Sequence, residues 1–132
     1  YLYFNRFMLK WFEKNYIFSL IITMIIAIVI FYISSLTFGP GTSVGSILPY
    51  FYHFLAFFWL CFFLLISLVK GKNLKFLFLS IIIVMAYAIS DEIHQLFVPY
   101  RTCSFFDVMI DFSGILAASF IYLLSFTKSG NF

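Results

Sequence analysis

The residues that could carry chemistry in this chain gather in one stretch, residues 90–111. It holds four of the five acidic residues, one of the two histidines and the only arginine outside residues 1–15. Carboxylates and imidazoles can move protons, and a guanidinium can bind a phosphate or carboxylate through two parallel hydrogen bonds. Because the surrounding sequence is overwhelmingly apolar, polar residues here are costly and are candidate functional residues. They are Asp91, Glu92, His94, Arg101, Asp107 and Asp111.

The composition is that of an integral membrane protein. Hydrophobic residues make up 64% of the 132 residues, charged residues make up 10%, and the mean hydropathy is +1.10. Soluble domains carry about 25% charged residues. The basic residues are few and their positions fit a membrane topology, so the sequence gives no support to a nucleic-acid partner.

Four helices are expected to cross the membrane and to position the polar stretch. No charged residue occurs from Asn15 to Val69, and a span needs about 20 apolar residues, so this region holds two spans and a turn. Turn signals at Gly39-Pro40-Gly41, Lys70-Gly71-Lys72 and Pro99 separate the spans. The predicted helices cover Tyr16–Phe38, Ile47–Val69, Leu74–Val98 and, after Ser104 as the N-cap with Asp107 as a capping-box acid, a last helix to Phe126.

The predicted fold is therefore all-α: an integral membrane bundle of four transmembrane helices over residues 16–127. Residues 1–15 form a separate N-terminal segment in which aromatic residues alternate with bases. That pattern is typical of a short helix lying in the membrane interface, or equally of an aromatic run-in to the first span. Cys61 falls deep in a span and Cys103 in a loop, so two free thiols are expected.

The positions of the bases predict the orientation. Three bases lie in residues 1–15, three lie between the second and third helices, and one follows the fourth helix. The first connection has none, and the third has only Arg101. Because lysine and arginine concentrate in cytoplasmic loops, both termini are expected in the cytoplasm of a multi-pass protein of the cell membrane. Residues 90–111 then lie at the outer face.

Helix length draws the polar residues into the membrane. Only 15 uncharged residues separate Lys75 from Asp91, and only 16 separate Asp111 from Lys128. These stretches reach roughly 24 Å, short of the ~30 Å hydrocarbon thickness. His53, Asp91 and Asp111 each lie roughly 10 Å below the outer end of a different helix, which predicts one cluster.

Spacing along the helices supports this cluster. Asp91 and His94 are three residues apart and Asp107 and Asp111 are four apart, so each pair can share a helix face. Gly114 continues the second face with Ala118, as small residues that let another helix approach closely.

Each of these residues also has a purely structural interpretation. Asp107 can serve only as a helix cap, His53 can bond a carbonyl of another helix, and Gln95 can be solvated at the rim. Asp91, Glu92, His94 and Asp111 can form a satisfied network that sets helix register without doing chemistry.

The polar stretch resembles the signature of the VanZ-like family of membrane proteins. The residues that carry the resemblance are Asp91-Glu92-Ile93-His94-Gln95-Leu96-Phe97-Val98-Pro99-x-Arg101, then Ser104, Asp107, Asp111 and Gly114, with Ile33-Ser34-Ser35 and His53-Phe54 earlier. The chain departs from the pattern where the family often has Gly at position 100, Lys shortly before His53, and Asn at position 111. The resemblance implies a bacterial-type, four-helix protein of the cell envelope. The family's namesake is associated with resistance to the glycopeptide teicoplanin.

The first hypothesis is an outward-facing pocket that binds or modifies an envelope lipid or a lipid-linked envelope precursor. Arg101 would pair with a phosphate or carboxylate. Asp91, Glu92 and His94 are the candidate catalytic residues, for acid–base work. The remaining candidates for substrate binding are His53, Gln95, Asp107 and Asp111.

Three other hypotheses stay open. His53, Asp91, His94 and Asp111 could bind Zn²⁺ or Mn²⁺ with Glu92 as the base. The acids could instead relay protons, although no ionisable group lies in the inner half of a span. A non-catalytic structural or partner-binding protein is the fourth. The sequence names no cofactor or substrate, and it leaves homo-oligomer formation open.

Overall fold

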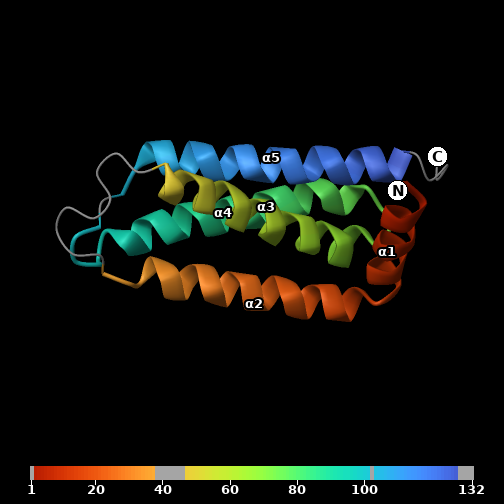
Figure 1. Ribbon diagram of the computed structural model, residues 1–132, viewed down its shortest axis with the longest axis horizontal. Coiled ribbons are helices and arrows are strands. Elements are labelled where there is room, and N and C mark those ends of the chain that lie inside the picture. The colour runs from red at the N-terminus through yellow and green to blue at the C-terminus, as the bar shows by residue number, and fades with distance from the viewer. Residues whose placement is uncertain (1, 38–46, 102, 128–132) are drawn as a thin grey trace.

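The computed structural model describes residues 2–37, 47–101 and 103–127, and the helices of this part of the chain are drawn in Figure 1. A short helix is followed by four long ones, and no strand occurs among the described residues. The helices are α1 (Leu2–Lys14), α2 (Tyr16–Ser34), α3 (Leu48–Val69), α4 (Lys75–Gln95) and α5 (Phe105–Thr127).

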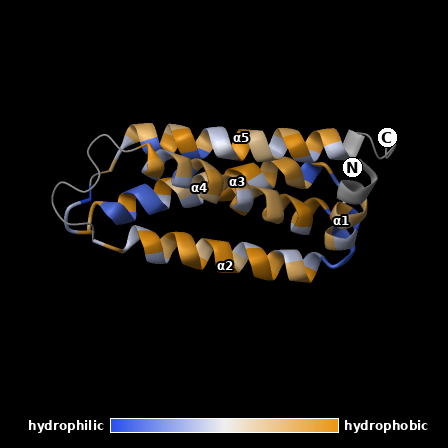
Figure 2. Ribbon diagram, in the orientation of Figure 1, coloured by the Kyte–Doolittle hydropathy of each residue, from blue (hydrophilic) through white to orange (hydrophobic). Residues whose placement is uncertain are grey.

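The four long helices confirm the predicted all-α membrane bundle. Within the described residues, α2, α3, α4 and the first 21 residues of α5 are each long and apolar enough to cross a membrane. The ribbon of these helices has mostly the hydrophobic colour (Figure 2), and many of their large apolar side chains are exposed, such as Ile28 and Phe78. In water such a surface would be unstable, whereas lipid tails are its natural solvent.

Helix α3 is the centre of the bundle. It packs against α5, α2 and α4, and it is the most buried of the four spans. Its side chains Phe57, Leu60 and Leu65 form the core together with Ile115 and Tyr122 of α5. The helix contains no Asp, Glu, Lys or Arg, so other helices can surround it without burying a fixed charge of α3.

Two helices end earlier than the sequence predicted. The first span was expected to reach Phe38 and the third to reach Val98, but α2 ends at Ser34 and α4 at Gln95. After α4, three successive amide groups bond the carbonyl three residues back, as Leu96 N–H does to Ile93 O. Such i→i+3 bonds tighten the last turn and end the helix before Pro99. The extension beyond residue 37 lies outside the described residues.

The close approach predicted at Gly114 is confirmed. A Cβ atom placed there would lie 2.5 Å from the Phe54 carbonyl oxygen and 3.2 Å from the Phe58 amide nitrogen, both backbone atoms of α3. Ala118, one turn further on, is fully buried. The small residues of α5 therefore let its backbone lie directly against α3.

Residues 2–14 form a short helix, and its place in the membrane interface stays a prediction. Figure 1 shows α1 running across the end of the bundle where α2 and α4 begin and α3 and α5 end. The Tyr122 hydroxyl of α5 donates to Glu13 Oε1 of α1 at 2.9 Å, and the Gly71 amide donates to the same hydroxyl at 3.3 Å. Gly71 has φ +64°, and a Cβ there would meet the Glu13 carboxylate at 2.6 Å.

Candidate functional site

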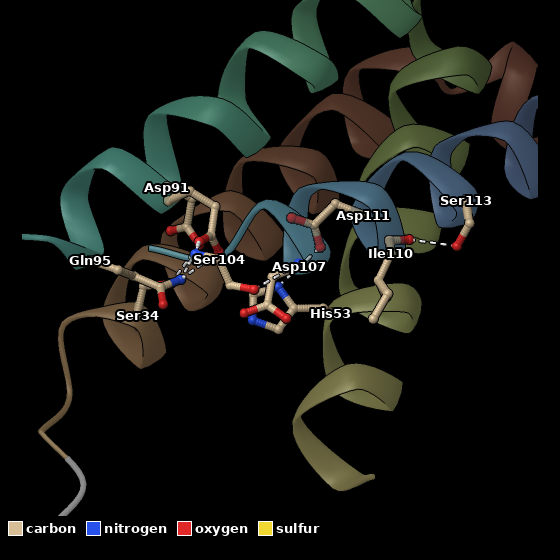
Figure 3. A network of polar contacts seen from close by, with 10 residues as sticks. Ser34, His53, Asp91, Gln95, Ser104, Asp107, Ile110, Asp111 and Ser113 are labelled. Atoms are coloured by element: carbon tan, nitrogen blue, oxygen red, sulfur yellow. Dashed lines mark hydrogen bonds and ion pairs between the residues drawn. The ribbon is translucent and has the colours of Figure 1, made fainter. Parts of the chain in front are cut away.

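The polar residues converge at the other end of the bundle, where α2 and α4 end and α3 and α5 begin (Figure 3). We call His53, Asp91, Glu92, Asp107 and Asp111 the acidic cluster. Four of them are buried, and Asp107 is half-buried. The structure thus brings together His53, Asp91 and Asp111, as predicted from their equal depth in three helices.

His53 and Asp111 form the contact between α3 and α5 in this cluster. His53 Nδ1 lies 3.0 Å from Asp111 Oδ1, and Asp111 is 0% exposed. His53 Nδ1 thus meets a carboxylate of α5, and not the carbonyl that the structural interpretation offered. The other oxygen, Asp111 Oδ2, is buried and has no hydrogen-bond partner among the described residues. A neutral imidazole with its proton on Nδ1 would donate to Asp111 and leave Nε2 as an acceptor.

Asp91 ties α4 to α2. The Ser34 hydroxyl donates to Asp91 Oδ2 at 2.8 Å, and the Gln95 amide donates to the same oxygen at 3.1 Å. Gln95 also donates to Glu92 Oε1 at 3.3 Å and is buried, so the interpretation that Gln95 is solvated at the rim is wrong. Asp91 Oδ1 has no partner among the described residues.

Glu92 points to the start of α5. The Ser104 amide donates to Glu92 Oε2 at 2.9 Å, and the Ser104 hydroxyl accepts from the Asp107 amide at 3.3 Å. Ser104 is thus the N-cap that was predicted. In the predicted capping box, the Asp107 carboxylate would accept a hydrogen bond from the Ser104 amide. The box is only half formed, because this amide donates to Glu92 of α4 instead. Asp107 Oδ1 is instead buried and unpartnered within the described structure.

His94 and Arg101 contact α2. His94 Nε2 lies 3.0 Å from the Ser35 hydroxyl, and its ring stacks on Phe31 with centroids 4.5 Å apart. Arg101 donates from Nη2 to Ile33 O at 3.0 Å and from Nε to Leu36 O at 3.4 Å. Both residues therefore close the end of α2 beside the cluster.

Sequence reasoning passed over the side chains that complete this site. Ser34 and Ser35 were noted only as part of a resemblance, although each meets a predicted site residue. Tyr52 was not considered, and its buried hydroxyl has no partner among the described residues. Its position beside His53 at the head of a charge-free span was the available signal.

Three residues of the cluster could hold a metal ion. One ligand atom each from His53, Glu92 and Asp111 lie within 4.8 Å of one another, and all three residues are buried. This set differs from the four ligands predicted from sequence. It includes Glu92, which was predicted to be the base, and it leaves out Asp91 and His94, of which His94 contacts Ser35. A buried set of carboxylates is costly unless a proton or a cation offsets their charge.

The fold and the site define a class: a helical membrane protein with four spans and a buried acidic cluster at one end. A family model described as VanZ/LLP1 matches residues 3–126. The chain belongs to the VanZ/LLP1 family, as its polar motif predicted. Comparison with curated proteins and with solved structures found no match.

Proposed function

We propose that the acidic cluster binds the polar headgroup of a lipid or a lipid-linked precursor of the cell envelope. On the predicted topology, the headgroup enters from the outer leaflet. By this binding the protein lowers the susceptibility of the cell to glycopeptides such as teicoplanin, the role associated with the namesake of the family.

The observation that carries this proposal is the set of unpartnered acceptors. Asp91 Oδ1, Asp107 Oδ1 and Asp111 Oδ2 are buried without a hydrogen-bond partner among the described residues. Buried acceptors left unpaired are destabilising, so their retention calls for a ligand that donates to them. Hydroxyl and amine groups of a headgroup are such donors.

The surrounding residues suit the remaining parts of a headgroup. The Arg101 guanidinium, beside the cluster, is chemically suited to a phosphate or carboxylate. Asp91, Glu92 and His94 remain the proposed acid–base residues. The geometry adds the His53–Asp111 pair to them, because a carboxylate that orients an imidazole is a common arrangement for proton transfer.

Teicoplanin susceptibility tests the proposal in a susceptible Gram-positive host that expresses the chain. We expect wild type to raise the inhibitory concentration and Glu92→Gln to return it to the vector level. Glu13→Gln is the matched control, since it makes the same change at the opposite end of the bundle. Immunoblots must show equal membrane levels. Full protection by Glu92→Gln at equal level would contradict a role for the cluster.

A divalent metal site is the second candidate, favoured by the proximity of ligand atoms from His53, Glu92 and Asp111. Nitrogen and oxygen ligands of this kind suit Zn²⁺ or Mn²⁺. Elemental analysis of the purified protein, after dialysis against each metal, provides the test. His53→Ala should lose the metal and His94→Ala should keep it, because the structure places His94 on Ser35. If the purified wild-type protein binds neither metal, the metal site is contradicted, and protons must offset the acidic charge.

A further inference from the structure

A cavity of about 800 Å³ lies at the end of the bundle opposite the acidic cluster. Its walls come from α1, from the start of α2 and from the turn between α3 and α4. Four described lysines line it, two from α1 and two from the turn, together with Glu13 and Tyr16. We call it the lysine cavity; its lysines are Lys10, Lys14, Lys70 and Lys72.

The charge of this cavity is strongly positive. Four ammonium groups line the cavity with a single carboxylate, Glu13, which attracts Lys10 and accepts a hydrogen bond from the Tyr122 hydroxyl at Oε1. Lys70 Nζ lies 3.5 Å from the centre of the Tyr16 ring, which holds one ammonium group at the wall. An anion would relieve the repulsion among the lysines.

A second hollow lies beside the lysine cavity, along the start of α2. It measures about 340 Å³ and shares Lys14 and Tyr16 with the cavity. Its other walls include Ile17, Phe18 and Ile21, whose apolar side chains are exposed on the first turns of a membrane span. A charged cavity beside an apolar hollow fits a molecule with an anionic head and a hydrocarbon tail.

We propose that the lysine cavity binds the phosphate of an anionic phospholipid, whose acyl chain lies along the first turns of α2. On the predicted topology this lipid belongs to the cytoplasmic leaflet, where basic pockets between helices bind anionic headgroups. This site is separate from the acidic cluster and does not depend on the function proposed for it.

Native mass spectrometry of the purified full chain tests the proposal, with dioleoyl phosphatidylglycerol as the probe and dioleoyl phosphatidylcholine as the neutral comparison. Phosphatidylglycerol should bind more tightly. Lys72→Gln should weaken its binding about fivefold, the loss typical of one basic residue at an anionic surface. Lys75→Gln is the matched control, because it removes the same charge three residues further on without lining the cavity.

Equal binding of the two lipids would overturn the proposal. Equal weakening by Lys72→Gln and Lys75→Gln would also overturn it, since the attraction would then be diffuse. Glycerol 3-phosphate distinguishes a lipid from a free phosphate compound. It should compete far more weakly than the lipid, because it cannot fill the apolar hollow; competition at equal concentration would show that the lipid assignment is wrong.

Discussion

At the scale of single residues, the His53–Asp111 contact is the most consequential in the site. Both residues are buried, and each comes from a different helix. Removing one member of such a pair leaves the other buried without a partner, which is strongly destabilising. A neutral residue of the same shape in place of the charged member fills the same space and leaves no buried charge.

We therefore expect Asp111→Asn to fold normally and His53→Leu to lose about 3 kcal/mol of unfolding free energy. Adding Asp111→Asn to His53→Leu should recover part of that loss, because the remaining buried group is then uncharged. Thermal unfolding in detergent, followed by circular dichroism, measures all three variants. Equal loss in Asp111→Asn and His53→Leu would mean that the charge of Asp111 itself supports the fold.

Arg101 combines a site position with a structural contact, and the two can be separated. Its guanidinium donates to Ile33 O and Leu36 O, whereas an ammonium group has no planar fork to reach both. Arg101→Lys should therefore speed amide exchange in residues 33–37 and also lose teicoplanin protection. Hydrogen exchange with peptide-level mass spectrometry gives the first readout. If teicoplanin protection is lost while amide exchange is unchanged, Arg101 instead acts by contacting the ligand.

At the scale of helices, α5 depends on a glycine to approach α3. The Cβ position of Gly114 lies 2.5 Å from a backbone oxygen, which cannot move aside as a flexible side chain could. Gly114→Leu should therefore destabilise the bundle by about 3 kcal/mol, the upper range for overpacking. Ala86→Leu is the control for added bulk, since Ala86 is exposed on α4. Equal folded yield and unfolding temperature for the two variants would contradict the close packing.

The docking of α1 should depend on pH through Glu13. Burial raises the pKa of Glu13 from its ordinary value of 4.5 in the docked state. A raised pKa means that docking is strongest below pH 4.5 and weakens as the pH rises through the docked-state pKa. Trp11 fluorescence, in a Trp59→Phe background, should report this change. Glu13→Gln should abolish it, and Tyr122→Phe should weaken docking because the hydroxyl donor is lost. A wild-type signal that stays flat with pH would exclude Glu13 as its source.

At the scale of the whole molecule, the predicted orientation decides which membrane leaflet each of the two proposed sites faces. Cys103 is exposed beside the acidic cluster, whereas Cys61 is buried. A thiol reagent that cannot cross membranes should label Cys103 in intact cells and should leave Cys103→Ser unlabelled. Labelling only after permeabilisation would reverse the topology. The acidic cluster would then face the cytoplasm and the lysine cavity the outside.

The fold could be predicted from sequence because a membrane makes hydropathy and length decisive. A charge-free run from Asn15 to Val69 has few alternatives to two spans, whatever the rest of the chain does. The common depth of His53, Asp91 and Asp111 followed from the same argument. Helix ends were less predictable, since α2 and α4 end in tightened turns that depend on local hydrogen bonds.

The partners of the site residues were decided only by the tertiary structure. Neighbouring positions on a helix point about 100° apart, so Asp91 and Glu92 face different helices although they adjoin in sequence. Asp91 meets Ser34 of α2, and Glu92 meets Ser104 at the start of α5. Which direction faces which helix depends on the rotation of α4 about its axis, and packing against three neighbours sets that rotation. For the same reason His94 meets Ser35, and the set that could hold a metal contains Glu92, which the sequence had assigned as the base, and lacks both Asp91 and His94.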